Sequence, residues 1–446
     1  MRVVTAVCLL AGAAVATAGM ASVAAAGRPS AAPEVAQVCP GPVGPGIARC
    51  NAIQLLNPAL NWHGVHVLAP AKGLGHGHGP GGGGGGGGGT TTTPSGYQPV
   101  DLQSAYGLSS ISWTSGTGET VAIVDAYNDP YAASDLAAYR SQWNLPAICV
   151  TGGSGSCSGP SFTQVNQNGQ PGPYPRANTS WSEEISLDLD MVSAICPYCN
   201  ILLVEAKSAS FSNLIAAEQT ALAAQPAAVS NSYGGSEFSG ETAYNGYYSS
   251  STSAITVSAG DGGYGVEYPA AAPSVVAVGG TTLSSASSTS AGSQTVWSGT
   301  GSGCSAYEQN PGWQPVTTLC SGRTVADVSA DANPATGVAV YDTYGESGWL
   351  VFGGTSVASP IVASVFALAG YHSSSSAAAQ GLYTNETSLT KITSGSNSSG
   401  CSDYLCNAAD SLGSTNSVTA TEYPDNGYNG PTGNGTPNGL NGLGAF

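Results

Sequence analysis

One serine in the C-terminal third of the chain has a setting that could make it a nucleophile. Ser356 lies within the stretch Gly353-Gly354-Thr355-Ser356-Val357-Ala358-Ser359-Pro360 and is expected to begin a helix. A serine hydroxyl is a weak nucleophile unless an adjacent base takes its proton. His372 follows sixteen residues later, at the far end of the expected helix. The other histidines lie in a short segment and a glycine-rich linker that precede the expected domain: His63, His66, His76 and His78. If Ser356 is reactive, a carboxylate is the expected base.

Two acidic residues are spaced to act together. Ser180 and Glu183 match a capping box, with Ser180 as the N-cap of a helix. Glu184 and Asp188 are four residues apart and share one face of that helix, whereas Asp190 faces elsewhere. Neighbouring carboxyls can share a proton, which separates their pKa values and suits a general base at acidic pH. Taken alone, the spacing more often reflects a solvated acidic first turn.

Short apolar runs and helix-like stretches alternate around these residues. The apolar runs are typical of buried strands, and the stretches between them have helical character. The expected strands are 120–124, 200–205, 227–231, 254–258 and 274–278, and the expected helices include 135–143 and 212–224. This alternation predicts an α/β fold with a mostly parallel central sheet flanked by helices.

The chain divides into a leader, a short segment, a linker and one larger domain. Residues 1–26 have the positive start, apolar core and small-residue cleavage pattern of a secretory signal. Residues 27–72 are too few to bury much core, and the Gly- and Thr-rich stretch 73–96 is expected to be a flexible linker. Residues 97–446 form one expected domain. Since no other apolar run is long enough to span a bilayer, we expect a secreted chain without a membrane partner.

Charge and cysteine content narrow the function further. With 26 Asp and Glu against 9 Lys and Arg, the chain is acidic, so nucleic acid is not an expected partner. Ten cysteines outside the leader fall in sequence-near pairs, which indicates local disulfides without fixing their connectivity: Cys39 and Cys50, Cys149 and Cys157, Cys196 and Cys199, Cys304 and Cys320, Cys401 and Cys406. The pair Cys196 and Cys199 also fits a redox or zinc site, although a second pair at zinc spacing is missing.

Several ordered motifs in residues 97–446 resemble the sedolisin family, also called serine-carboxyl peptidases, which has a subtilisin-like fold. The matching stretches are Glu184 with Asp188, Ser258-Ala259-Gly260-Asp261, Val278 to Leu283, Ala326 to Pro334, and Gly354-Thr355-Ser356 with Pro360. The resemblance implies that Ser356 attacks a scissile carbonyl, that Glu184 is its general base, and that Asp188 orients Glu184.

The resemblance also implies roles for residues around this triad. Asp261 would be the oxyanion donor, which requires a protonated carboxyl and so an acidic optimum, although an aspartate before two glycines is also a common turn. Asp125 takes a supporting place behind the triad, or is simply a turn residue at a strand end. The stretch Ser232-Tyr233-Gly234 resembles the family's substrate-pairing edge, where backbone groups bind an extended peptide.

Two features depart from the family pattern. Most relatives carry a large prodomain that assists folding and inhibits the zymogen, whereas only residues 27–96 separate signal and domain here, so that route of inhibition is not predicted. The family's calcium site is altered, because Lys391 and Asn429 stand where the family has carboxylates. Lys391 is expected to take the place of the cation, paired with Asp425, or else to be solvent-exposed. No metal or other cofactor is predicted.

These observations favour a secreted serine-type endopeptidase that cleaves polypeptides at acidic pH through a Ser-Glu-Asp triad, as a monomer. The alternative is a catalytically silent secreted binding or surface protein that kept the peptidase fold. An esterase of the α/β-hydrolase type fits less well, because Ser356 lacks the Gly-x-Ser-x-Gly elbow and His372 would have to be its base.

Overall fold

The computed structural model describes residues 33–40, 44–58, 94–153, 157–314, 319–412 and 427–440. The expected signal peptide (1–26), most of the expected linker and Asp425 lie outside these ranges. None of the helices in the described ranges combines the length and the apolar character that crossing a membrane requires.

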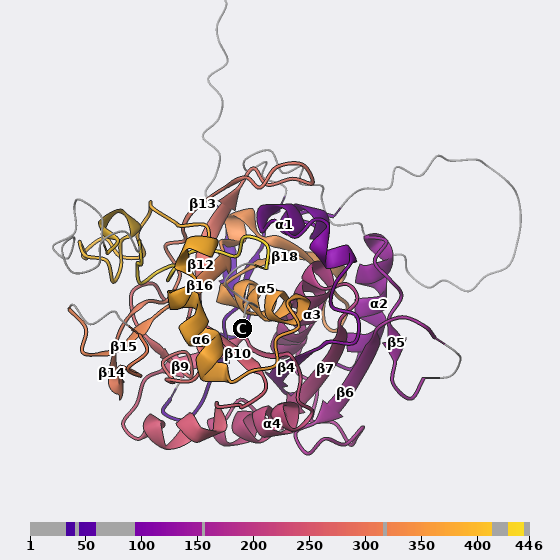
Figure 1. The fold of residues 1–446 in the computed structure, drawn as a ribbon. Coiled ribbons are helices and arrows are strands. Elements are labelled where there is room, and N and C mark those ends of the chain that lie inside the picture. Colours follow the sequence, from indigo (N-terminus) through magenta and orange to yellow (C-terminus); the bar gives the residue numbers. More distant parts are fainter. Residues whose placement is uncertain are drawn as a thin grey trace, which may run out of the picture. The chain divides into compact units, whose positions relative to one another are not determined.

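A nine-stranded sheet forms the centre of the described chain (Figure 1). Its strand order is β13-β12-β10-β8-β4-β7-β6-β5, with β16 paired to β12, and all neighbours are parallel except β12 and β13. The strands are β4 (Thr120–Ala126), β5 (Cys149–Val150), β6 (Ser161–Asn166), β7 (Asn200–Ala206), β8 (Ala228–Asn231), β10 (Ala254–Ser258), β12 (Val276–Ser284), β13 (Ser293–Val296) and β16 (Val328–Asp331). The predicted α/β fold with a mostly parallel sheet is confirmed.

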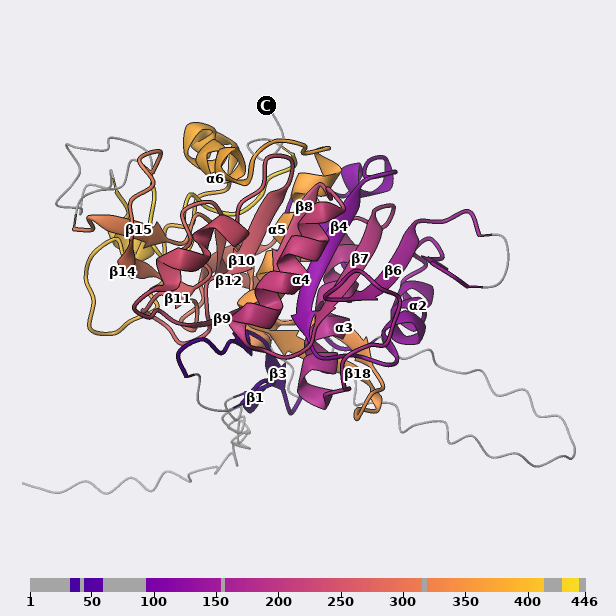
Figure 2. The ribbon, with the colours of Figure 1, turned by 90° about the horizontal axis from the view of Figure 1, so that it is seen from below.

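Helices cover both faces of this sheet. In Figure 2, α4 (Phe211–Ala223) lies in front of the strands and α5 (Thr355–Leu368) behind them. α3 (Thr179–Ile195) packs beside α5 and against β4. Every residue of α5 is buried, which explains why its sequence is apolar on all sides. The remaining α-helices of the described residues are α1 (Pro99–Ala105), α2 (Ala132–Gln142) and α6 (Ser375–Thr384).

The short segment before the expected linker adds strands to two smaller antiparallel sheets. In one sheet the order is β1 (Val35–Gln37), β3 (Ile53–Leu55), β18 (Gly348–Gly353) and β17 (Val338–Asp342). In the other, β2 (Arg49–Cys50) pairs with β9 (Tyr233–Ser236), which also pairs with β11 (Glu267–Tyr268). A two-stranded sheet consists of β14 (Gly303–Gln309) and β15 (Gly322–Val325).

The expected local disulfides are present. The structure joins the ten cysteines within their sequence-near pairs, namely Cys39–Cys50, Cys149–Cys157, Cys196–Cys199, Cys304–Cys320 and Cys401–Cys406. The Cys196–Cys199 bridge closes the turn between α3 and β7, so neither sulfur is a free thiolate that could bind zinc.

The start of α3 differs from the sequence prediction. Its N-cap is Asn178, whose side-chain oxygen accepts a hydrogen bond from the backbone nitrogen of Trp181 (3.1 Å). The predicted capping box of Ser180 and Glu183 is therefore wrong, because a cap two residues earlier places both inside the helix. Glu183 is buried instead, and this burial raises its pKa to about 8.

Carboxyl groups outside α3 are buried as well. Burial raises the pKa of Glu205 and of Glu218 to about 8, of Asp342 to about 7 and of Asp129 to about 6. In an unfolded chain these groups titrate near pH ~4. The stability that each contributes is therefore fully present below its unfolded pKa and is lost as pH rises through its folded pKa. We expect the fold to lose stability between about pH 4 and pH 8.

Replacing Glu218 by glutamine should reduce this loss, because the amide keeps the shape of the side chain without an ionisation that burial opposes. We expect the Tm difference between pH 4 and pH 8 to narrow by about 2–4 °C. The measurement uses a Ser356→Ala background, which excludes self-digestion, and the exposed residue Glu34 changed to glutamine is the matched control. An unchanged Tm difference in Glu218→Gln, or an equal narrowing in Glu34→Gln, would contradict the analysis.

Candidate active site

Ser356 lies in the first turn of α5, where the chain passes the residues that follow β8 and β10. Its hydroxyl donates to the carbonyl oxygen of Ser232 (3.2 Å), just after β8. The carboxyl ends of parallel strands meet at one edge of a sheet, so residues from distant parts of the sequence gather at this helix end. Because α5 is buried along its whole length, the Ser356 hydroxyl is held by a rigid element.

Gly354 leaves space beside Ser356 that a side chain would fill. Its φ of 97° is a conformation that residues with a Cβ rarely adopt. A Cβ at this position would lie 2.2 Å from the carbonyl oxygen of Asn51 and 2.6 Å from Oδ2 of Asp261. Glycine therefore lets a peptide carbonyl and an aspartate oxygen approach the same point next to Ser356.

Glu184, Asp188 and Asp125 form a buried group of carboxyls near Ser356. Burial, followed by the charges of Asp188 and Asp125, raises the pKa of Glu184 well above its usual range, and the nearby Ser356 hydroxyl lowers it. In the structure that hydroxyl donates to Ser232, and both carboxyl oxygens of Glu184 are buried without a hydrogen bond to a described residue. Burial and the charge of Asp125 likewise raise the pKa of Asp188, whose Oδ1 accepts from the Ser232 hydroxyl (2.8 Å). Burial raises the pKa of Asp125 to about 8. Each of these three carboxyls therefore keeps its proton to a higher pH than an exposed carboxyl would.

Asp261 is held by the residue that precedes Ser356. Its Oδ1 accepts from both the backbone nitrogen and the hydroxyl of Thr355, at 2.8 Å each, and that hydroxyl in turn accepts from the nitrogen of Gly260 (3.1 Å). Burial raises the pKa of Asp261 to about 7, although the Thr355 bonds lower it. Since Oδ1 already accepts two bonds, the proton of a neutral Asp261 belongs on Oδ2, the oxygen that faces the space beside Gly354.

The stretch Ser232-Tyr233-Gly234 lies at the start of β9, directly beside Ser356. One edge of β9 pairs with β11, and the other pairs with residues from the N-terminal segment, Arg49 opposite Gly234 and Cys50 opposite Tyr233. Its backbone groups therefore bind an extended peptide in this structure, and that peptide belongs to the same chain.

Asn51 is the residue at this site that sequence reasoning missed. Its nitrogen donates to the Ser232 carbonyl (3.1 Å), and its carbonyl oxygen accepts from the backbone nitrogen of Ser356 (2.9 Å). The strands on either side of it have two and three residues, too short for a periodic pattern. The one available signal was the Cys39 and Cys50 pair, which indicates a disulfide directly before Asn51.

His372 lies away from Ser356. It follows the end of α5, a helix of 14 residues and so about 20 Å long, and it is exposed. One of its ring nitrogens is 2.9 Å from Oε2 of Glu119. The four other histidines lie outside the described residues. In the described chain, the groups beside the Ser356 hydroxyl that can take a proton are therefore carboxyls.

The two residues expected to alter the family's calcium site, Lys391 and Asn429, contact other protein groups. The Lys391 nitrogen is 3.8 Å from Oε2 of Glu386, and its expected partner Asp425 is not among the described residues. The fully buried Asn429 donates to the Ile392 carbonyl (3.1 Å), while its side-chain oxygen accepts from the nitrogen and hydroxyl of Thr432 (3.1 and 2.8 Å). The one amide oxygen that could face a cation therefore already accepts two bonds.

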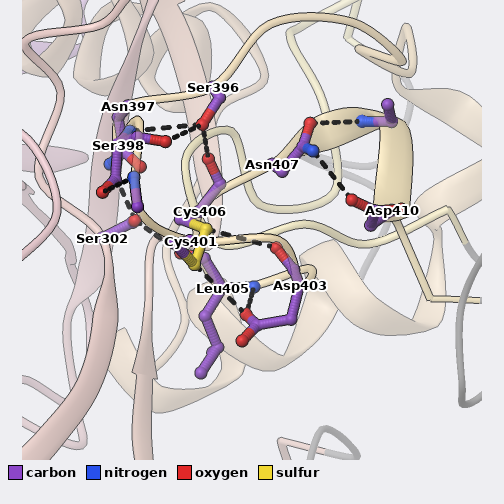
Figure 3. Close-up of a disulfide and its surroundings, with 12 residues drawn as sticks. Ser302, Ser396, Asn397, Ser398, Cys401, Asp403, Leu405, Cys406, Asn407 and Asp410 are labelled. Atoms are coloured by element: carbon purple, nitrogen blue, oxygen red, sulfur yellow. Dashed lines mark hydrogen bonds between the residues drawn. A yellow bond between two sulfur atoms is a disulfide. The ribbon is translucent and has the colours of Figure 1, made fainter.

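The neighbouring C-terminal loop is held by covalent and hydrogen bonds within the chain. Figure 3 shows the Cys401–Cys406 disulfide, with Asp403 accepting from the Leu405 nitrogen (2.9 Å) and Ser396 donating to the Cys406 carbonyl (2.8 Å). Cys401, Asp403 and Cys406 are close enough together to hold an ion, but the disulfide removes both thiolates as ligands.

Comparison with known proteins gives similar sequences and similar structures. No family model matches the chain. It is 41% identical to sedolisin from Pseudomonas sp. (strain 101) over 115 residues, which are 23% of this chain and 19% of that protein. It is 29% identical to kumamolisin from Bacillus sp. (strain MN-32) over 311 residues, which are 61% of this chain and 52% of that protein. The chain thus spans about half of one relative and about a fifth of the other.

A solved structure of Pseudomonas sedolisin, a serine-carboxyl proteinase complexed with two molecules of pseudo-iodotyrostatin, matches the fold with a TM-score of 0.61 and 22% identity. The match covers 79% of this chain and 97% of that one. The subtilisin-like α/β fold predicted from the sequence is thereby confirmed.

From the contacts of Lys391 and Asn429 we propose that this chain is stable without calcium. A chelator, or millimolar calcium added to the chelated protein, is expected to leave the Tm of the Ser356→Ala protein unchanged. The physical reason is that a cation at this place would meet an ammonium group and an amide oxygen that is already bonded. Differential scanning calorimetry with and without calcium is the check, and a Tm that rises with calcium and falls again with chelator would refute the proposal.

Proposed function

The matches to sedolisin and kumamolisin support the sedolisin family for this chain, and from that premise we propose that it is a secreted serine-type endopeptidase that cleaves polypeptides at acidic pH. The observation that carries the proposal is the meeting of Ser356, Glu184, Asp188 and Asp261 at the buried start of α5. The described chain brings no imidazole to this place, and the carboxyls are the groups that can take the serine proton.

In the proposed reaction, the Ser356 hydroxyl attacks the scissile carbonyl and gives its proton to the ionised form of Glu184, which returns it to the leaving amine. Asp188 positions Glu184 and is itself positioned by the Ser232 hydroxyl. Asp125, buried close enough to affect the pKa of both residues, takes the supporting place behind the pair. The developing oxyanion is stabilised by the backbone nitrogen of Ser356 and by a protonated Asp261.

The acidic optimum follows from the donor role of Asp261. An ionised carboxylate has no hydrogen to donate, so Asp261 stabilises the oxyanion only below its pKa of about 7. Removing one such donor raises the barrier by about 3 kcal/mol. The proposed place of action is an acidic medium outside the cell, and five disulfides in the described chain suit an oxidising compartment.

The function is tested by digestion of a denatured protein between about pH 3 and pH 7. We expect Ser356→Ala and Glu184→Gln each to lose activity by at least about 10³-fold, because a catalytic unit fails when one member is removed. Ser364→Ala, a serine of the same helix that donates only to the Pro360 carbonyl, and Glu183→Gln, the neighbouring buried glutamate, are the matched controls and should retain activity. An inactive wild-type protein would instead favour a silent binding protein that kept the fold.

The pH dependence is tested by changing Asp261. In Asp261→Asn the side-chain oxygen can still accept from Thr355, and its amide can donate at every pH, so we expect activity to persist above pH 7 where that of the wild type falls. Asp261→Ala has no donor and should lose about 10²–10³-fold in kcat at all pH values. The kcat profile against pH for the three proteins is the measurement, and an unchanged alkaline limb in Asp261→Asn would remove Asp261 from this role.

A further inference from the structure

The N-terminal segment lies across the candidate active site as an extended peptide. Before Asn51 the segment pairs with β9 through β2. After Asn51 it pairs through β3 with β18, two strands that Figure 2 labels, and Ile53 lies opposite Gly353. Both pairings are antiparallel. Further upstream, the nitrogen of Ala48 donates to the carbonyl of Ala209 (2.8 Å). The segment is thus bound on both sides of one peptide bond, the bond between Asn51 and Ala52.

The carbonyl oxygen of that bond lies where the proposed oxyanion would form. The carbonyl oxygen of Asn51 accepts from the backbone nitrogen of Ser356 (2.9 Å), and Oδ2 of Asp261 approaches the same space beside Gly354. The nitrogen of Asn51 is fixed by the Ser232 carbonyl, the group to which the Ser356 hydroxyl also donates. A scissile carbonyl needs its oxygen among the donors and its carbon beside the nucleophile.

The side chain of Asn51 is held as specifically as its backbone. It is fully buried, and its amide nitrogen donates to the Ser258 hydroxyl (2.9 Å) and to Oε2 of Glu267 (3.3 Å). Gly234 leaves the space that Glu267 occupies, since a Cβ there would lie 2.4 Å from Oε2. A short side chain with an amide donor fits this pocket, and a longer one would displace the groups that line it.

Glu267 also binds a second residue of the segment. Its Oε1 is 3.3 Å from a guanidinium nitrogen of Arg49, two residues before Asn51. Glu267 thus contacts both the guanidinium group of Arg49 and the side-chain amide of Asn51, which together form an Arg-x-Asn sequence.

We propose that the chain is its own substrate: Ser356 cleaves the Asn51–Ala52 bond, and the pocket formed by Ser258 and Glu267 makes asparagine the preferred residue before the cut. This inference rests on the proposed peptidase function and names its substrate class, polypeptides with asparagine before the cleaved bond and a basic residue two positions earlier.

The chemistry requires water and no other reactant. The oxygen of Ser356 bonds to the carbonyl carbon of Asn51, and the bond to the nitrogen of Ala52 breaks. The serine proton passes through Glu184 to that nitrogen, which leaves as the amine of a new chain end. Water then hydrolyses the ester on Ser356, which restores the hydroxyl and leaves a carboxyl group on Asn51.

The disulfide of the segment lies entirely on one side of the cleaved bond. Cys39 and Cys50 both precede that bond, so their bridge stays within the released piece and does not tether it to the rest. Backbone pairing of β1 with β3 and of β2 with β9 then holds the piece without a covalent link. While it remains, the edge of β9 is occupied and another polypeptide cannot pair there. Cleavage and release therefore control access to the site.

The first test compares the full-length wild-type chain with Ser356→Ala at about pH 4, by N-terminal sequencing and intact mass. We expect a new N-terminus at Ala52 in the wild type and an uncut bond in Ser356→Ala. Asn51→Gln, one methylene longer with the same amide, should slow this cut by at least about 10-fold. Asn57→Gln is the matched control, since Asn57 accepts from the Glu34 nitrogen away from Ser356. The Tm of both variants, measured in the Ser356→Ala background, shows whether either has lost its fold.

The second test uses peptides with the sequence of residues 49–55, serine replacing Cys50, and asparagine or glutamine at the position of Asn51. Wild-type enzyme already processed should prefer the asparagine peptide by at least about 10-fold in kcat/KM. Replacing the arginine of the peptide by alanine should lower kcat/KM a few-fold for the wild type but not for Glu267→Gln, which keeps the pocket's shape without its charge.

The outcomes separate this inference from the function on which it rests. A wild type that digests denatured protein but keeps its Asn51–Ala52 bond, starts at another residue, or cleaves Asn51→Gln at the same rate would overturn the inference alone. A folded wild type that digests nothing and keeps its own chain intact would overturn the proposed function together with it.

Discussion

Glu184 and Asp188 belong to a helix whose residues from Glu183 to Ile195 are all buried, and a carboxylate in such a place is strongly disfavoured unless it is paired or protonated. The chain supplies few cations, 9 Lys and Arg in total, so protonation is the solution open to most of its buried acids. The rest of the structure depends on this constraint. Because burial raises their pKa, the candidate catalytic carboxyls can exchange protons near the pH at which they work. The stability of the folded state depends on pH over the same range.

Stability and the proposed chemistry therefore share one cause. Desolvation raises the pKa of Asp261 to about 7, where its proton is available to an oxyanion, and it raises the pKa of Glu218, on the far side of the sheet, to about 8. The raised pKa of Asp261 serves the candidate active site, whereas the raised pKa of Glu218 does not. The proposed acidic medium would therefore suit the fold of the whole chain as well as its candidate active site.

The features of the fold that could be predicted from the sequence are those that depend on a local pattern of residues. Apolar runs such as 120–124 became parallel strands because both faces of the sheet are covered, and the spacing of four placed Glu184 and Asp188 one helical turn apart. The helix start was misjudged because Asn178 and Ser180 are both good caps, and which one serves depends on the tertiary position of the first turn. The strands at 49–50 and 53–55 could not be predicted, since their conformation comes from the partners β9 and β18.

The strands β9 and β18 also explain why the Asn51–Ala52 bond, and no neighbouring bond, lies beside Ser356. Antiparallel pairing fixes register residue by residue, and a slip by one would turn each side chain to the opposite face. With Arg49 opposite Gly234 and Ile53 opposite Gly353, the residues between them have no freedom to shift, and the carbonyl oxygen of Asn51 must enter the space left by Gly354. Backbone pairing thus sets the position of the bond, and in the proposed cleavage the contact of the Asn51 side chain with Glu267 would add selectivity. In the proposed reaction, a substrate from another chain would be placed by the same extended backbone. The site would then distinguish one polypeptide from another at the residue before the cut and at the residue two positions earlier, the two that Glu267 contacts.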